Sequence, residues 1–254
     1  MAQGLHITIR ANIFIEKYKY LNIICLNMKT AELLEELKGR GLYVFSIYDA
    51  AKLMQKSIAY ASLFLSKSKE FVRIEKGKYA IKGTDPFVVA SNILYPSYLS
   101  LASAMRFYDL IDQNIVKYSV ISVKRHASIL FNGSIIEFKH IKRERFFGYV
   151  KKDNVYVAEI EKLFIDCIYF GTPDFATVLE ALKYAIESKK IDLKKIQEYI
   201  IKFNDKNLVN KMGFLLDLAG VEADEIFGKG RKGYVRISGL GKSGIDRKWL
   251  VKYD

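Results

Sequence analysis

Residues 46–81 read SIYDAAKLMQKSIAYASLFLSKSKEFVRIEKGKYAI, and this segment contains several local structure signals in close succession. Ser46 and Asp49 have the spacing of a capping box, in which each side chain bonds to the backbone N–H of the other residue. This pattern predicts a helix over Ile47–Gln55. A further helix is predicted over Ser57–Ser66, so the first half of the segment contains two short helices joined by a tight turn.

The second half of the segment predicts a β-hairpin. The apolar runs Phe71–Glu75 and Lys78–Ile81 flank Lys76-Gly77, a basic turn in which glycine accepts the backbone geometry that a two-residue hairpin needs. An earlier helix is predicted over Ala31–Lys38. Three short helices followed by a hairpin is the element order of a winged helix-turn-helix domain, which we expect over residues 29–84.

Composition excludes several classes of protein. The 254-residue chain is 50% hydrophobic and has 3 prolines, which excludes disordered and collagen-like chains and allows one large domain or two modest ones. Cys25 and Cys167 are too far apart for a zinc motif or a disulfide framework, so an intracellular protein without a structural metal is predicted. Because no apolar run approaches the roughly 18–20 residues that span a bilayer, we expect a soluble cytoplasmic protein.

The net charge of +13 favours an anionic partner, either nucleic acid or a lipid surface. The charge is segmental: residues 29–83 carry 11 positive and 6 negative charges, and residues 117–152 carry 9 and 2. Residues 153–227 carry 9 and 14. A membrane-surface role is not favoured, because the amphipathic helices have the pattern of ordinary core helices.

Gly83-Thr84-Asp85-Pro86 contains strong turn residues and indicates a domain boundary. Residues 85–254 are therefore expected to form a second domain. It ends in a basic tail, because the glycines and lysines of residues 228–248 indicate a flexible tail or hairpin. Residues 1–28 are left as an N-terminal arm or strand, or as a translated leader upstream of a start at Met28.

The second domain is predicted to be a mixed α/β domain of β-hairpins packed on helices, so the whole chain belongs to the α+β class. Asn132-Gly133 and Asp153-Asn154 each join two apolar runs and predict hairpin turns. Thr172-Pro173 is expected to occupy the N-cap and first position of a helix. The helices are expected at 99–111, 158–170, 193–203 and 207–219, and strands at 116–123, 129–131, 134–138, 146–150, 155–157 and 234–238.

Several segments in this order resemble the AbiEi family, the antitoxin and transcriptional-regulator half of AbiE-type (type IV) toxin–antitoxin systems. Residues 71–83, with Arg73, Gly77 and Tyr79, are similar to the wing of that family. The other matching segments are 95–113, Phe147-Gly148 and 157–166, the last with Glu161-Lys162 and Asp166. Leu163-Phe164 depart from the family's usual Ala-Leu, and residues 1–27 have no counterpart.

The resemblance implies a sequence-specific DNA-binding autorepressor whose second domain counteracts a co-encoded nucleotidyltransferase-like toxin. It implies no enzymatic activity and no cofactor. The expected partners are double-stranded DNA from the protein's own operator and the toxin, while direct contact with the toxin stays open. We expect a monomer or a weak homo-oligomer.

The predicted third helix of the winged domain would lie in the major groove and its hairpin would contact the backbone or minor groove. Ile58, Ala61 and Leu65 fit an inward stripe of this helix, so the intervening residues face outward. Lysine suits phosphate, whereas serine and tyrosine suit phosphate or base edges. The candidate DNA-binding residues are Lys56, Ser57, Tyr60, Ser62, Lys67, Lys69, Arg73, Lys76, Lys78, Lys142, Arg143 and Arg145.

Each candidate also has a plainer interpretation. In the alternative interpretation of the winged domain, its lysines are only solvated and the domain binds another protein. The cations around 139–152 form a DNA surface, a partner surface or a charged strand edge that prevents aggregation. Glu161, Lys162 and Asp166 lie on the most apolar helix, where a buried ion pair that fixes helix register is favoured over a catalytic role.

An enzymatic alternative rests on Glu137 and Lys139. An acidic-x-Lys triplet on a strand is the core of PD-(D/E)xK-type nucleases, in which carboxylates hold Mg²⁺. The upstream aspartate that this site requires is not evident in the sequence. Gly239–Gly244 resembles a phosphate loop, but Arg236 stands where the Walker pattern needs glycine, so nucleotide binding is rejected.

Overall fold

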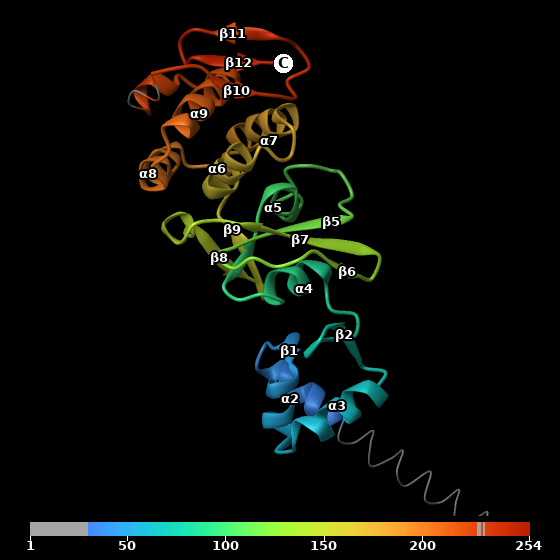
Figure 1. Cartoon of the computed structure of the whole chain (residues 1–254). Coiled ribbons are helices and arrows are strands. Elements are labelled where there is room, and N and C mark those ends of the chain that lie inside the picture. The colour runs from blue at the N-terminus through green and yellow to red at the C-terminus, as the bar shows by residue number, and fades with distance from the viewer. Residues whose placement is uncertain (1–29, 228–229, 231) are drawn as a thin grey trace, which may run out of the picture. The chain divides into compact units, whose positions relative to one another are not determined.

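The computed structural model describes residues 30–227, 230 and 232–254, so the predicted arm over residues 1–28 lies outside the described residues. The chain divides into two compact units, Met1–Thr84 and Asp85–Asp254 (Figure 1). Each unit combines helices with a β-sheet, which places the protein in the α+β class. In the part of the chain that the structure describes, no helix combines the length and apolar character that crossing a lipid bilayer requires.

Unit 1 contains helices packed against a three-stranded antiparallel sheet. Its strands are hydrogen-bonded in the order β1-β3-β2. The elements, in chain order, are a helix over residues 30–39, β1 (Val44–Ser46), α2 (Ile47–Met54), α3 (Ile58–Lys67), β2 (Phe71–Glu75) and β3 (Lys78–Ile81).

The local signals of the sequence account for these elements. The capping box at the start of α2 is confirmed: the Asp49 carboxylate accepts the Ser46 N–H at 2.8 Å, and the Ser46 hydroxyl accepts the Asp49 N–H at 3.2 Å. The hairpin of β2 and β3 turns at Lys76-Gly77 as predicted. Phe45 of β1 and Phe71 of β2 pack edge to face with ring centres 5.5 Å apart. Both rings belong to the apolar core that the sheet shares with Leu37, Ala50 and Phe64 of the helices.

Unit 2 is built on a six-stranded mixed sheet with the strand order β6-β7-β5-β4-β9-β8. The strands are β4 (Ser97–Leu99), β5 (Lys117–Ser122), β6 (Ile129–Phe131), β7 (Ser134–His140), β8 (Tyr149–Lys152) and β9 (Val155–Ala158). Both predicted hairpin turns are confirmed. Asn132 and Gly133 have positive φ angles, as do Asp153 and Asn154, which is the geometry of the tight turns that match strand twist.

Helices cover both faces of this sheet. Helix α4 (Pro86–Asn92) packs on β4, β5 and β9, while α5 (Leu101–Phe107) and α6 (Ile160–Phe170) lie on the opposite side (Figure 1). Every residue of α6 from Glu161 to Ile168 is buried, so the helix that is the most apolar in the sequence lies in the centre of its unit.

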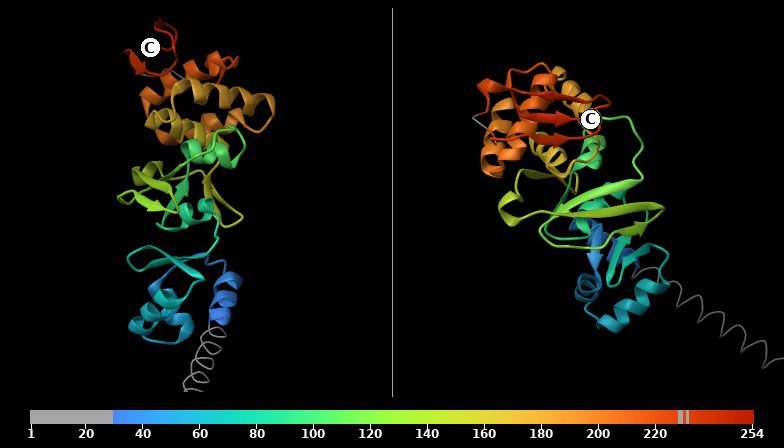
Figure 2. Two further views of the ribbon diagram at one scale, coloured as in Figure 1. Left: turned by 90° about the vertical axis from the view of Figure 1, so that its right-hand side faces the viewer. Right: turned by 45° about the horizontal axis from the view of Figure 1, so that its top comes forward.

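The C-terminal part of unit 2 packs around α6. It consists of α7 (Phe175–Glu187), α8 (Leu193–Phe203), α9 (Lys206–Leu218) and a small sheet with the order β10-β12-β11 beside α9 (Figure 2). The strands are β10 (Val235–Ile237), β11 (Gly244–Asp246) and β12 (Val251–Tyr253). The strand predicted over 234–238 is β10. The surrounding segment 228–248 is predicted to be a flexible tail or hairpin, but its described residues contribute both β10 and β11 to this sheet.

Two predicted helix starts are wrong. The helix predicted over 99–111 is the shorter α5, which begins at Leu101 because Leu99 ends strand β4 and pairs with both β5 and β9 at the centre of the sheet. Helix α7 is not capped by Thr172-Pro173. Its N-cap is Asp174, whose carboxylate accepts the Thr177 N–H at 2.9 Å and therefore satisfies the first turn of the helix.

Candidate nucleic-acid interface

Helix α3 is held in unit 1 by one face only. The chain leaves α2 at Gln55, which has a left-handed conformation, and α3 begins after Ser57, whose hydroxyl accepts the Tyr60 N–H at 3.2 Å. The buried residues of α3 are Ala61, Phe64 and Leu65. The other faces of the helix are exposed, so α3 is anchored to the core but open to a partner.

The inward stripe differs from the predicted one at a single position. Ala61 and Leu65 are buried as predicted, but Ile58 is 47% exposed and Phe64 takes the third inward position. The reason is packing: Phe64 belongs to the apolar core of unit 1, whereas Ile58 lies in the first turn, beyond that core. Leu63 is also 55% exposed, so α3 presents two large aliphatic side chains to solvent.

The residues predicted around α3 are all exposed. These residues are Lys56, Ser57, Tyr60, Ser62, Lys67 and Lys69. The Lys56 ammonium lies 6.0 Å from the centre of the Tyr60 ring, and that ring stacks on Phe64 at 6.4 Å. The hydroxyl of Ser57 serves as the helix cap, so its first role is structural.

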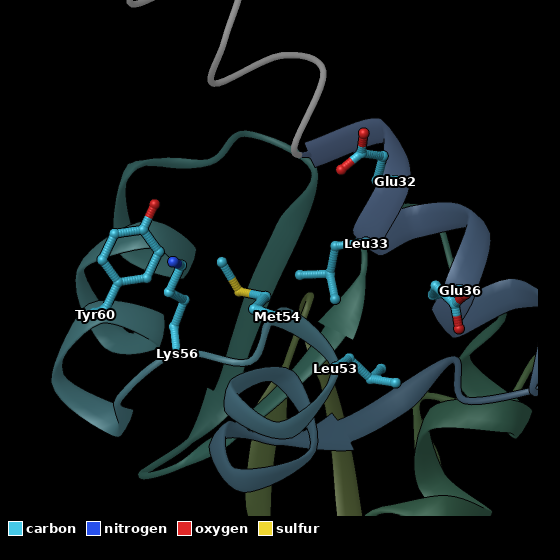
Figure 3. Close-up of a pocket in the computed structure, with 7 residues that line it drawn as sticks. All are labelled: Glu32, Leu33, Glu36, Leu53, Met54, Lys56 and Tyr60. Carbon is cyan, nitrogen blue, oxygen red and sulfur yellow. The ribbon is translucent and has the colours of Figure 1, made fainter.

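A hollow of about 360 Å³ opens beside the start of α3 and was not predicted from the sequence (Figure 3). Its floor is apolar, Lys56 and Tyr60 stand on one side, and the carboxylates of Glu32 and Glu36 stand on the other. Because two carboxylates one helical turn apart repel phosphate, an anionic partner is expected to contact the Lys56 side of the hollow. The lining residues are Glu32, Leu33, Glu36, Leu53, Met54, Lys56 and Tyr60.

The hairpin of unit 1 is short and its cations differ in availability. The Ile47 N–H donates to the Gly77 carbonyl at 2.8 Å, which ties the turn to the start of α2. The Nε of Arg73 donates to the Glu75 carbonyl at 3.1 Å, and Lys78 forms an ion pair with Glu75 at 3.1 Å. Lys76 lies at the exposed turn. Among the three predicted hairpin cations, Lys76 is therefore the best placed for a phosphate contact.

The basic stretch of unit 2 divides into exposed and enclosed residues. Lys142 and Arg143 are exposed at the start of the short 3-10 helix η1 (Arg143–Arg145). Arg145 is only 19% exposed in its side chain and forms an ion pair with Asp205 at 3.2 Å. Its guanidinium also lies 4.7 Å from the centre of the Phe203 ring.

This geometry corrects one predicted site residue. The guanidinium of Arg145 is occupied within unit 2, where it joins η1 to α8 and α9. Lys142 and Arg143 are the two predicted cations of this stretch that stay exposed to a DNA contact. The sequence contained three cations in four positions but no signal for which of them points inward.

A buried polar network lies between the large sheet of unit 2 and helix α6. The Asp166 carboxylate forms an ion pair with Lys162 one turn earlier on α6, and both side chains are fully buried. Asp166 also accepts hydrogen bonds from the Tyr98 hydroxyl at 3.1 Å and from the Ser100 hydroxyl at 3.0 Å. The Lys162 ammonium donates to the Tyr98 hydroxyl at 3.0 Å.

The environment of this network opposes charge. Burial lowers the pKa of Lys162 and raises the pKa of Asp166, while the contact between the two groups opposes both changes. The Lys162 ammonium is enclosed by rings of Tyr98, Phe147 and Phe203, with centres 5.5, 5.4 and 5.2 Å away. Each polar group is satisfied by another member of the network, which supports the structural interpretation favoured by the sequence.

A second polar cluster joins α6 to α8 and was not predicted. The Glu159 carboxylate accepts hydrogen bonds from Lys195 at 2.8 Å and from the Tyr199 hydroxyl. Partial burial opposes ionisation of Glu159, but these bonds outweigh it and hold its pKa below the usual value. Partial burial and the Glu159 carboxylate raise the pKa of Tyr199 to about 12. Because these groups bond to one another, the cluster stabilises the packing of α8 against the start of α6.

The proposed nuclease triplet lies in a different setting from a metal site. Glu137 is on β7, where its carboxylate faces the ammonium groups of Lys139 at 3.6 Å and Lys117 at 3.9 Å. Among the residues that the structure describes, no three His, Cys, Asp or Glu side chains gather in a group suited to a metal ion. Nothing in this geometry adds support to the nuclease alternative.

Comparison with known proteins gives a result for the fold alone. No model of a known protein family matches the chain, and no curated protein matches it significantly. Among solved structures, the chain is similar to the Rv2827c protein from Mycobacterium tuberculosis, with a TM-score of 0.60 and 13% sequence identity. The match covers 88% of this chain and 90% of that one, so the likeness extends over both units.

Proposed function

We propose that the protein is a cytoplasmic DNA-binding autorepressor and antitoxin of the AbiEi type. In this proposal, residues 29–84 form a winged helix-turn-helix domain that binds double-stranded DNA in the protein's own operator. Residues 85–254 form the antitoxin domain that counteracts a co-encoded nucleotidyltransferase-like toxin. The chain performs neither role by catalysis and needs no cofactor.

The observation that carries the DNA-binding proposal is the exposed face of α3 within the element order of unit 1. The order is helix, β1, α2, α3, β2, β3, with α3 following α2 after a three-residue turn. In proteins with this order the equivalent of α3 enters the major groove, whose width of about 12 Å admits one helix. The surplus of cations over residues 29–83 complements the phosphate backbone.

The antitoxin proposal rests on the family resemblance, and one structural observation supports it. The two segments that carry most of the resemblance, 95–113 and 157–166, are far apart in sequence. They meet in the buried network, where Tyr98 and Ser100 from the first segment bond to Asp166 from the second. Residues from both segments of the resemblance therefore form one hydrogen-bonded network, as expected if both segments belong to the core of the same domain.

The DNA-binding proposal is tested by measuring affinity for a duplex that contains the region upstream of the protein's own reading frame. The variant combines Lys56→Ala with Tyr60→Ala, and a matched control combines Lys194→Ala with Tyr184→Ala on exposed positions of unit 2. We expect the first variant to lose at least tenfold in affinity and the control to bind normally. Equal losses from both would refute the assignment of α3.

Salt dependence supplies an independent readout of the same experiment. Each lost phosphate contact lowers the slope of log affinity against log salt concentration by about 0.9. If Lys56 contacts phosphate, the variant should show a shallower slope than the wild-type protein. An unchanged slope would show that Lys56 makes no phosphate contact.

The antitoxin proposal is tested in cells that express the product of the adjacent reading frame. The full chain carrying Lys56→Ala and Tyr60→Ala is supplied from a constitutive promoter, so that repression of the operon plays no part. We expect growth to be rescued as well as by the wild-type chain. If rescue is lost together with DNA binding, the separate antitoxin role of unit 2 is refuted.

A further inference from the structure

Helix α3 presents an unusual set of side chains to a partner. The residues opposite its buried face are Ala59, Ser62, Leu63 and Ser66, and all of them are exposed. Ile58 and Tyr60 flank them, and each is also exposed. The helix from Ile58 to Lys67 contains no arginine, asparagine, glutamine, aspartate or glutamate.

This set lacks the side chains that read most bases by hydrogen bonds. In the major groove, guanine is read mainly by arginine or lysine, adenine by asparagine or glutamine, and cytosine by glutamate or aspartate. Thymine alone presents a methyl group, which apolar side chains contact, and serine hydroxyls accommodate several base edges. Lys67 is the one residue of α3 among these kinds, and it lies at the C-terminal end of the helix, whereas the N-terminal residues of a recognition helix contact the base edges. The exposed face of α3 ahead of Lys67 therefore matches thymine better than any other base.

We infer that α3 recognises its DNA through apolar contacts of Leu63 and Ile58 with the 5-methyl groups of thymine. The inference rests on the proposed function and deepens it by naming the kind of sequence that is bound, an operator with thymines at the positions under α3. Specificity then comes from methyl contacts and DNA shape, while the lysines at the two ends of the helix hold the backbone.

Charge favours DNA over a protein as the occupant of this face. Lys56 precedes the helix, and Lys67 and Lys69 lie at its end, all exposed. The exposed face of α3 between them carries no acidic residue. An apolar strip bounded at both ends by cations complements a groove whose walls are phosphates and whose floor carries methyl groups.

The experiment compares two duplexes of the region upstream of the protein's own reading frame. One is amplified with dTTP and the other with dUTP, which removes the thymine methyl groups but keeps every hydrogen-bonding edge. Because burial of one methyl group corresponds to about a fourfold change in affinity, the wild-type chain should bind the uracil duplex about four times more weakly for each methyl contacted.

Variants then locate the contact. Leu63→Ala combined with Ile58→Ala should bind the two duplexes equally well, whereas Leu63→Met should retain the preference for thymine because it keeps an apolar side chain. Ile201→Ala, at an exposed aliphatic position of α8, is the control and should behave as wild type. Circular dichroism melting checks that the α3 variants remain folded.

The outcomes separate this inference from the proposed function. Equal binding of both duplexes by the wild-type chain would refute methyl recognition while leaving DNA binding intact. A preference for thymine that survives in the Leu63→Ala, Ile58→Ala variant would also refute it, because the methyl contact would then lie elsewhere. Failure to bind either duplex at any salt concentration would refute the proposed function itself.

Discussion

Replacing Lys162 with methionine is expected to destabilise unit 2 severely. The substitution keeps the length and apolar stem of the side chain but removes the ammonium group that pairs with Asp166. Asp166 is then left fully buried with two hydroxyl donors, Tyr98 and Ser100, and without a counter-charge. Removal of one partner from a buried ion pair costs about 3–5 kcal/mol of unfolding free energy.

The structure also predicts how this loss depends on pH and on a second substitution. In the Lys162→Met variant the pKa of Asp166 is raised above its unfolded value by burial, so the loss is present at pH 7 and is relieved as pH falls and Asp166 becomes protonated. Replacing Asp166 with leucine in the same chain removes the buried charge. The double variant should therefore recover most of the stability.

Trp249 makes the measurement selective. It is the one tryptophan of the chain, and it is buried in unit 2, so its fluorescence during urea unfolding reports on this unit. The control is Lys183→Met, which breaks an exposed pair with Glu180 on α7 and is expected to cost less than about 1 kcal/mol. A loss for Lys162→Met as small as that of the control would refute the reasoning, because the pair would then be solvated.

Two further predictions concern unit 2. Partial burial opposes ionisation of Asp217, but hydrogen bonds from Lys248 and Trp249, each 2.7 Å, outweigh it and hold its pKa below the usual value. Asp217→Asn should therefore lower the free energy of unfolding by about 1–2 kcal/mol at pH 7, as measured by urea unfolding. The difference between variant and wild type should shrink as pH falls below about 4, because the wild-type carboxylate then becomes protonated. A difference independent of pH would contradict this prediction. Gly148→Ala should lower the free energy of unfolding by at least about 1 kcal/mol more than Gly171→Ala in the same assay. Both glycines have positive φ, but only at Gly148 would the new methyl group lie within 3.0 Å of neighbouring side chains. Equal losses would show that backbone strain alone is responsible.

Local chemistry carried most of the secondary structure. The capping box at Ser46 and Asp49, the hairpin turns at Asn132-Gly133 and Asp153-Asn154, and the apolar helix α6 are each specified by residues within a few positions of one another. Such signals act through backbone geometry and nearby side chains, and they are therefore readable without knowledge of the rest of the chain.

Within the candidate interface, the sequence determined which residues are polar and basic but not all of their directions. Lys56, Tyr60 and Ser62 are exposed as predicted. The exposure of Ile58 depends on where the core of unit 1 ends, and the enclosure of Arg145 depends on Asp205 and Phe203, which lie far along the chain. The sequence around a cation in a basic run does not show whether that cation contacts DNA or forms an ion pair within the protein.

Features that depend on contacts between distant segments can be established only from the tertiary structure. The apolar character of Leu99 suits a buried helix as much as a strand, and its pairing with β5 and β9 makes it the last residue of β4. The sequence determined that Lys162 and Asp166 share a helix face. Only the fold brought Tyr98 and Ser100 to them, because hydrogen bonds between distant segments form once the sheet and α6 are packed together.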